Sequence, residues 1–374
     1  MAQPTPTKGS TEDKATANGN GATPTAPRPA VAAATEGSGS PDTLAALGRG
    51  LDVGTANLLA AHQRPDGQPL VKAERNAFLE LPSEFTVNTS MLTNLRVPYV
   101  SYDGRLYVLG NPSFDLANLL SREVRRPMRD GFLAPDEKDA IPMLRFMVEK
   151  LLGEPAEPGE PVFFSLPAPS IDRENDTVYH EGIVGGLVKK LGFTPHALNE
   201  AHAIVYSELG DEEFTGITVS CGGGMFNVCV AYKAIPAVTF SVSRGGDWID
   251  EHVARVMGIP RTRATALKEG DVDLSAPKTR EQEAVVLYYR SLISYVLKNL
   301  KQRFALAKDV PQFTAPVPLV VAGGTSLVGG FAEVFAEELG SVDLGIPVSG
   351  VRRAEDAMTS VARGCLIAAA LGEG

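Results

Sequence analysis

Three consecutive glycines between two apolar runs restrict the fold of this chain more than any other feature. They are Gly222, Gly223 and Gly224, and runs rich in β-forming residues flank them within residues 216–232. Because glycine accepts most backbone conformations, the pattern predicts a strand, a tight turn and a second strand. Backbone N–H groups at such a bare tip can converge on an anion such as a phosphate. An ordinary hairpin turn is the alternative that this motif alone leaves open.

A second copy of the pattern occurs at residues 50–61, where a turn of small residues separates two apolar runs. Two such hairpins predict an internal duplication, with one phosphate-binding loop from each half facing a shared cleft. A third motif, residues 318–331, predicts a buried strand, a glycine turn and the start of a helix, whose N-terminus adds N–H donors. Helices are also predicted at residues 136–152, 173–191 and 280–306 from their apolar periodicity.

In this order, the three motifs resemble the phosphate-1, phosphate-2 and adenosine motifs of the actin and sugar-kinase ATPase superfamily. Within it the chain is most similar to the MreB-type bacterial actins. That similarity rests on Leu-Asp-Val-Gly-Thr-Ala-Asn at 51–57, Arg-Pro-Met-Arg-Asp-Gly at 126–131 and the segment 355–364. The resemblance covers roughly residues 50–371. It implies an α/β chain with an actin/ribonuclease H-like fold, in which two similar domains flank a nucleotide cleft.

The domain boundaries follow from the same resemblance and from composition. Domain I is expected to comprise residues 47–212 plus 352–374, and domain II residues 213–351. Residues 1–46 are rich in Ala, Thr, Pro, Gly and Ser and have no apolar segment. They are therefore expected to form a disordered tail, since they cannot bury enough apolar surface to offset the entropy of ordering.

The resemblance also assigns the site residues, with ATP and magnesium as the cofactors. Asp52 would anchor the magnesium ion, and Glu200 would orient the attacking water, so that these two residues are the catalytic candidates. The alternative for Glu200 is a solvated acid at a helix start. Asp247 is expected to cap the helix that follows it. The residues expected to bind the nucleotide are Gly54, Thr55, Ala56, Asn57, Gly222, Gly223, Gly224, Gly245, Gly246, Lys268, Gly323, Gly324 and Thr325.

The phosphate-2 motif departs from the family pattern. Typical members carry a second aspartate, then Gly-Gly-Gly-Thr-Thr and another acid, whereas these places hold Ser220, Met225, Phe226 and Asn227. A magnesium-directing carboxylate and a phosphate-binding hydroxyl are therefore replaced, while the backbone loop is kept. This predicts that nucleotide binding survives and that hydrolysis is slow. The short segment 269–278 stands where polymerising relatives insert a small subdomain, which counts against polymerisation.

Composition excludes several classes of function. The chain has 35 Lys and Arg against 45 Asp and Glu, a formal net charge of −10, which argues against a nucleic-acid partner. Its three cysteines are too few for a disulfide or zinc framework and suit a reducing compartment. No signal peptide, spanning helix or basic amphipathic segment is evident. A cytoplasmic location without a direct membrane anchor is therefore expected.

Several functions remain open from the sequence. The first is a bacterial cytoskeletal protein that binds ATP, assembles into filaments and acts in cell shape or organisation, at most as a slow ATPase. The second is a pseudo-ATPase scaffold that recruits protein partners, which the changes at Ser220 and Met225 favour. The third is a chaperone-like or reactivase-like ATPase. A small-molecule kinase is disfavoured because no sugar-site signature is present.

Overall fold

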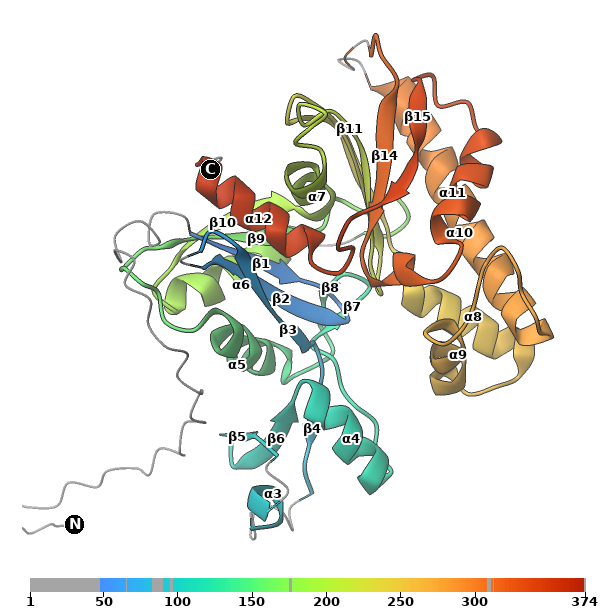
Figure 1. Cartoon of the computed structure of the whole chain (residues 1–374). Coiled ribbons are helices and arrows are strands. Elements are labelled where there is room, and N and C mark those ends of the chain that lie inside the picture. The colour runs from blue at the N-terminus through green and yellow to red at the C-terminus, as the bar shows by residue number, and fades with distance from the viewer. Residues whose placement is uncertain are drawn as a thin grey trace, which may run out of the picture. The chain divides into compact units, whose positions relative to one another are not determined.

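Two five-stranded mixed sheets dominate the computed structural model (Figure 1). The structure describes residues 48–64, 66–82, 90–94, 97–174, 177–307, 311 and 313–372. The tail predicted for residues 1–46 lies outside the described residues. The first sheet has the order β10-β9-β1-β2-β3 and the second the order β13-β12-β11-β14-β15.

The two sheets share one topology, as the predicted duplication requires. In the first, β1 (Arg49–Val53), β2 (Asn57–Gln63) and β3 (Pro69–Arg75) form an antiparallel meander, and β1 pairs in parallel with β9 (Pro161–Leu166), which pairs in parallel with β10 (Thr194–Asn199). In the second, β11 (Gly216–Cys221), β12 (Phe226–Tyr232) and β13 (Ile235–Val242) form the meander. There β14 (Val317–Ala322) and β15 (Val348–Arg353) take the places of β9 and β10.

Each sheet contributes to an apolar cluster of its own, and a third cluster joins residues of both sheets. Buried residues of α5 (Ala140–Leu152) and α6 (Thr177–Lys190) pack with the first sheet. The second core is built largely from α8 (Gly246–Met257), α10 (Arg280–Leu306) and α11 (Phe331–Gly340), with α9 (Arg261–Lys268) contributing Ala264. The helix predicted at 280–306 is α10, whereas the two predicted at 136–152 and 173–191 begin later, at Ala140 and Thr177.

The last helix, α12 (Ser360–Leu371), packs on β1 and on α7 (Glu200–Glu208). This packing depends on small residues, because a Cβ on Gly50 would lie 2.6 Å from the backbone nitrogen of Leu366. The chain thus returns to the first sheet after completing the second. The division into domains at 212/213 and 351/352 is consistent with this path and stays a prediction.

A smaller part of the first half was expected from the sequence only as short β-like runs, including residues 97–100 and 106–109. It contains the sheet β4 (Phe78–Glu80), β6 (Arg105–Leu109) and β5 (Tyr99–Tyr102), together with α3 (Ser90–Asn94) and α4 (Asn111–Leu120). A two-stranded sheet, β7 (Met128–Arg129) and β8 (Phe132–Leu133), follows. Within the described ranges, no helix is both long and apolar enough to cross a membrane.

Candidate functional site

The turns of the two predicted hairpins are built alike. Val53 pairs with Leu58 across the first turn and Cys221 with Phe226 across the second, so each turn holds four residues. The first turn is closed by Gly54 N–H donating to the Asn57 carbonyl at 3.0 Å. The second is closed in the same way, by Gly222 N–H and the Met225 carbonyl at 2.9 Å. The two loops are therefore equivalent, although their sequences differ.

The tips of these loops lie against each other. A Cβ on Gly223 would lie 3.2 Å from the Cβ of Ala56, and one on Gly224 would collide with the Thr55 hydroxyl. The Thr55 hydroxyl also accepts a hydrogen bond of 2.9 Å from the backbone N–H of Gly131. Only glycine in the second loop allows this close approach. The structure therefore brings together both loops and the 126–131 segment.

Four backbone N–H groups at the tips are available to a ligand. Those of Thr55, Ala56, Gly223 and Gly224 donate to no other described residue. Unpaired N–H groups at bare turns can bind an anion such as a phosphate. Because the tips are in contact, they must separate to admit it.

The second loop is supported from behind by the start of α8. Gly246 N–H and Asp247 N–H donate to the carbonyls of Gly222 and Gly223 at 3.1 and 2.8 Å. A Cβ on Gly245 would lie 2.5 Å from both of these carbonyls, so this contact requires glycine. The Thr325 hydroxyl donates to the Gly222 carbonyl at 2.9 Å. The backbone carbonyls on this side of the loop are thus hydrogen-bonded to the start of α8 and to Thr325.

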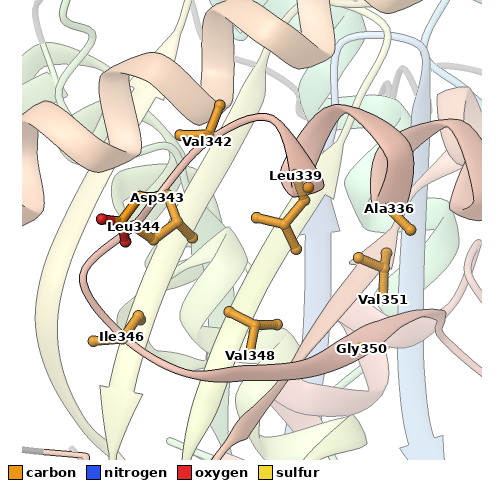
Figure 2. A pocket seen from close by; sticks show the side chains of 10 residues that line it. Ala336, Leu339, Val342, Asp343, Leu344, Ile346, Val348, Gly350 and Val351 are labelled. Carbon is orange, nitrogen blue, oxygen red and sulfur yellow. The ribbon is translucent and has the colours of Figure 1, made fainter.

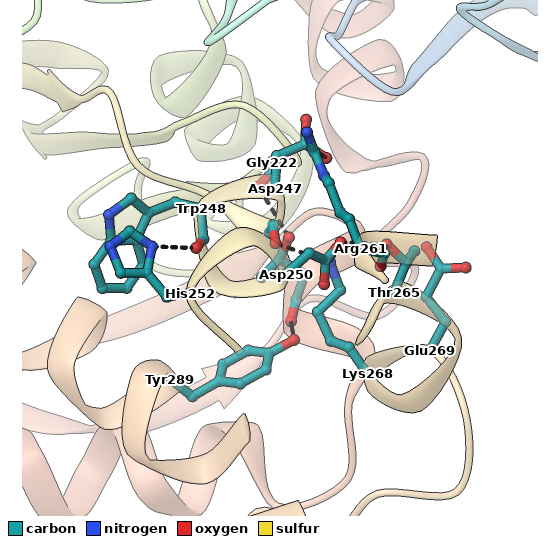
Figure 3. A network of polar contacts seen from close by, with 12 residues as sticks. Gly222, Asp247, Trp248, Asp250, His252, Arg261, Thr265, Lys268, Glu269 and Tyr289 are labelled. Carbon is teal, nitrogen blue, oxygen red and sulfur yellow. Dashed lines mark hydrogen bonds and ion pairs between the residues drawn. The ribbon is translucent and has the colours of Figure 1, made fainter. Parts of the chain in front are cut away.

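Lys268 belongs to a buried polar cluster beside α8 (Figure 3). Its ammonium donates to Asp250 Oδ2 at 2.9 Å and to the Gly246 carbonyl at 3.0 Å. The Thr265 hydroxyl donates to the same carboxylate oxygen at 2.8 Å, whereas Asp250 Oδ1 is buried and has no partner among the described residues. The lysine expected at the nucleotide therefore lies next to the loop, held by an aspartate.

The prediction that Asp247 caps α8 is wrong. The N-cap is Gly245 and no side chain caps the helix. The Asp247 carboxylate instead pairs with Arg126 at 3.0 Å and with Arg261 at 3.0 Å. Because the helix begins at Gly246, Asp247 lies within its first turn, where two guanidinium groups attract its carboxylate.

Asp52 is held at the end of β1 by Ser165 of β9. The Ser165 hydroxyl donates to Asp52 Oδ1 at 2.9 Å and accepts from the Val53 N–H at 2.8 Å. Burial raises the pKa of Asp52 to about 6, and the hydrogen bond from Ser165 opposes that rise. The carboxylate is thus fixed beside the first loop.

Glu200 is not a solvated helix-start acid. It is the first residue of α7 and is 8% exposed. Ser220 Oγ and Asn227 Nδ2 both donate to its Oε2, at 3.3 and 2.8 Å. Burial, followed by the charge of Asp52, raises the pKa of Glu200 to about 8, while the two hydrogen bonds oppose the rise. The charge of Asp52 thus acts on Glu200, and the catalytic roles of the two residues stay predictions.

The residues that depart from the family pattern have clear partners. Ser220 and Asn227 hold Glu200, as described above. Met225 is 2% exposed and packs on the turn that contains Gly131. The places of two acids are thus taken by the hydrogen-bond donors Ser220 and Asn227, and those of two threonines by the buried apolar residues Met225 and Phe226.

The third motif lies beside the second hairpin, because its strand β14 pairs in parallel with β11. Gly323 has a φ of 92° and lies against the backbone of Cys221, where a Cβ would come within 2.5 Å of the carbonyl oxygen. Its N–H donates to the Ala357 carbonyl at 2.7 Å. Gly324 begins a short 3₁₀ helix that contains Thr325. The turn is therefore built into the second sheet and reaches the loop through Thr325.

Sequence reasoning missed several residues of this region. Ser165 was detectable as a polar residue within an apolar strand. Asn76 holds the first loop, since its side chain donates to the Gly54 carbonyl at 2.9 Å and its N–H donates to the Ala56 carbonyl. Asn76 follows β3 without any motif that would have indicated this role. The sequence indicated Arg126 only as part of the segment 126–131 that resembles MreB-type actins, and not as a partner of Asp247.

Two cavities lie elsewhere. One, of about 370 Å³, is formed by α11, β15 and the segment between them, and Figure 2 shows its apolar lining, including Leu339, Val342 and Val348. The other, of about 940 Å³, is lined by residues around Pro169 and Asp172. Neither includes a residue of the two loops. In the part of the chain that the structure describes, no three or more His, Cys, Asp or Glu side chains form a group that could hold a metal ion.

Comparisons with known proteins show the family and the fold of this chain. The model of the Volactin family matches residues 47–369. The chain belongs to the Volactin family. No curated protein matches its sequence.

Solved structures similar to this Volactin-family chain have the actin fold. A MamK double helical filament gives a TM-score of 0.65 at 19% identity, covering 87% of this chain and 98% of that one. MreB5 of Spiroplasma citri bound to AMPPNP gives 0.61 at 16% identity, covering 86% and 95%. The ethanolamine utilization protein EutJ from Carboxydothermus hydrogenoformans gives 0.50 at 21% identity, covering 86% and 89%. These likenesses confirm the predicted fold and the similarity to MreB-type actins.

Proposed function

We propose that this Volactin-family chain binds ATP with magnesium between its two loops, hydrolyses it slowly and assembles into cytoplasmic filaments. The observation that carries the proposal is the set of unpaired N–H groups at Thr55, Ala56, Gly223 and Gly224. Actin-fold neighbours described as a filament or as bound to AMPPNP and ADP add support. A role in cell shape or organisation belongs to the same proposal.

The residues present fit a nucleotide with one magnesium ion. Magnesium usually keeps several waters and takes one or two carboxylates together with phosphate oxygens. Asp52 would hold the hydrated ion, which would neutralise charge on the phosphates. Glu200 would accept a proton from the attacking water. Because its pKa is about 8, most Glu200 is protonated at pH 7, and this supports slow hydrolysis.

The pseudo-ATPase scaffold is the second candidate. It is favoured by Ser220 and Met225, which leave the second loop without the usual acid and hydroxyl. A scaffold would bind protein partners whether or not ATP is present. Its binding partners would then have to be identified separately.

One set of measurements separates the two candidates. Purified protein is sedimented with and without ATP and magnesium, while ATP binding and phosphate release are measured on the same samples. The proposed function predicts ATP binding, ATP-dependent pelleting and slow phosphate release. Absence of ATP binding would contradict it, and binding without turnover or pelleting would favour the scaffold.

A further inference from the structure

Asn227 lies between Glu200 and the segment that follows β9. It is the second residue of β12 and is fully buried. Its Nδ2 donates to Glu200 Oε2 at 2.8 Å, and its Oδ1 accepts from the backbone N–H of Ala168 at 2.9 Å. Resting on the proposed hydrolysis of ATP, we propose that Asn227 is a positioning residue that aims the Glu200 carboxylate at the attacking water.

The orientation of the Asn227 amide is set by its two partners. A flipped amide would place Oδ1 against the Glu200 carboxylate and Nδ2 against the Ala168 N–H, which leaves two acceptors facing and two donors facing. Only one orientation therefore satisfies both neighbours. A buried amide fixed in this way therefore fixes the orientation of the carboxylate to which it donates.

The two hydrogen bonds to Glu200 leave one of its oxygens available. Ser220 and Asn227 both donate to Oε2, whereas Oε1 accepts no hydrogen bond from another described residue. The oxygen that is held fixes the plane of the carboxylate, and Oε1 is the oxygen that can accept a proton from water. An acid at position 227 would donate nothing and would repel Glu200. The neutral amide therefore suits the role.

A matched control comes from Ser241. Its hydroxyl donates to the Ala168 carbonyl at 2.7 Å and its side chain is fully buried, so it holds the same segment as Asn227. No hydrogen bond between Ser241 and Glu200 occurs among the described residues. Asn227→Ala and Ser241→Ala thus both loosen the segment around Ala168, and only the first releases Glu200. Asn227→Asp keeps the side-chain volume and the acceptor for Ala168 but removes the donor to Glu200.

The experiment measures ATP affinity and single-turnover hydrolysis at saturating magnesium in the wild type and these three variants. We expect Asn227→Ala and Asn227→Asp to slow hydrolysis by about tenfold, the size of effect that a misplaced catalytic group produces. ATP affinity should stay within about twofold, since the phosphates are held by backbone groups. Ser241→Ala should hydrolyse within about twofold of the wild type. Thermal melts identify any variant that fails to fold, and the Asn227 variant that melts like the wild type then decides.

The outcomes separate this inference from the proposed function. If the wild type binds no ATP, the proposed function itself fails. If the wild type binds ATP and the Asn227 variants hydrolyse it at the wild-type rate, only the role of Asn227 is overturned. The role of Asn227 is likewise overturned if Ser241→Ala is slowed as much as Asn227→Ala. If the wild type binds ATP without turnover, the proposed hydrolysis fails together with the role of Asn227.

Discussion

At the scale of single residues, Ser220 and Asn227 stand where typical family members carry acids, and this changes the charge of the buried site around Glu200. Asp52 and Glu200 bring two carboxylates to the base of the loops, and burial already raises the pKa of both. The neutral Ser220 and Asn227 stabilise Glu200 through hydrogen bonds instead of adding charge. Another carboxylate here would be costly to bury unless a cation neutralised it.

The raised pKa of Glu200 predicts a pH-dependent stability. Its pKa rises from 4.5 to about 8 on folding, so the protonated form is the one that the folded state favours. The stability that this proton contributes is complete below about pH 4.5 and is lost as the pH rises towards 8. Through Glu200 alone, the unfolding free energy without nucleotide should fall by up to about 1.4 kcal/mol per pH unit within that window, and the raised pKa of Asp52 adds to the fall below about pH 6. In Glu200→Gln the contribution of Glu200 is absent, so its denaturation midpoint should change less between pH 5 and 8. Parallel profiles for the two proteins would contradict the assignment.

A new acid at position 220 should make the protein depend on magnesium. The Ser220 hydroxyl is 3.3 Å from Glu200, so Ser220→Asp adds a third carboxylate to the pair. We expect a lower melting temperature in EDTA and recovery with magnesium and ATP. Combined with Met225→Thr, it should raise single-turnover hydrolysis by about tenfold or more, equivalent to 1.36 kcal/mol or more of transition-state stabilisation. Glu200→Ala should abolish turnover in both backgrounds. Equal melting of Ser220→Asp with and without magnesium would contradict this expectation.

At the scale of elements, the hairpins and the longest helix were predictable because their signals are local. Three glycines between β-forming runs specify a turn, and the apolar register of α10 specifies a helix of 27 residues. The runs expected at 97–100 and 106–109 correspond to β5 and β6, whereas β4 and the pairing of the three strands into a sheet were not predicted, because strands of three to five residues carry little signal. Helix α4 carried a signal that could have found it, since Pro112 lies at its start.

The hydrogen bonds that hold the Glu200 carboxylate could not be predicted, because they depend on contacts between elements distant in sequence. Its position at a helix start suits a solvated acid equally well. What decides its environment is the packing of α7 against β11 and β12, which brings Ser220 and Asn227 to the carboxylate. Resemblance located the residue, and only the structure supplied its partners.

The packing of α12 on α7 gives an element-scale prediction. A Cβ on Gly364 of α12 would overlap the carbonyl of Ala203 in α7, whereas one on Gly182 of α6 would meet no atom within 4 Å. Gly364→Ala should therefore destabilise the protein by about 3 kcal/mol through overpacking. Gly182→Ala, the same change in an open helical position, should stabilise it by about 0.5–1 kcal/mol. Chemical denaturation of the two variants tests this, and equal stabilities would show that α12 is packed differently.

At the scale of the whole molecule, the two halves are in contact at the loop tips as well as through the packing of α7 on β11 and β12. Gly224 touches Thr55, Met225 packs on the Gly131 turn, and Arg126 pairs with Asp247. Each contact joins the 50–131 part of the chain to the second sheet or its helices. A nucleotide can reach the tip N–H groups only after these contacts loosen. Entry of the nucleotide should therefore be limited by opening and not by diffusion.

The two arginines on Asp247 allow a test of this opening. Arg126 joins the halves, whereas Arg261 lies on α9 within the second half, and each guanidinium is 3.0 Å from the carboxylate. An ion pair between the halves must break when the loop tips separate. Removing such a partly exposed pair should therefore increase the rate of this opening by about fivefold. Arg126→Gln should therefore speed ATP association about fivefold, and Arg261→Gln by less than twofold.

The single tryptophan, Trp248, adjoins Asp247 and reports the event through its fluorescence in stopped flow. Salt offers an independent check, because it screens an ion pair at this exposure. Raising ionic strength should therefore speed association to the wild type and leave Arg126→Gln largely unaffected. If both arginine variants speed association equally, the effect belongs to Asp247 and the α8 start, and the contact between the halves does not control entry.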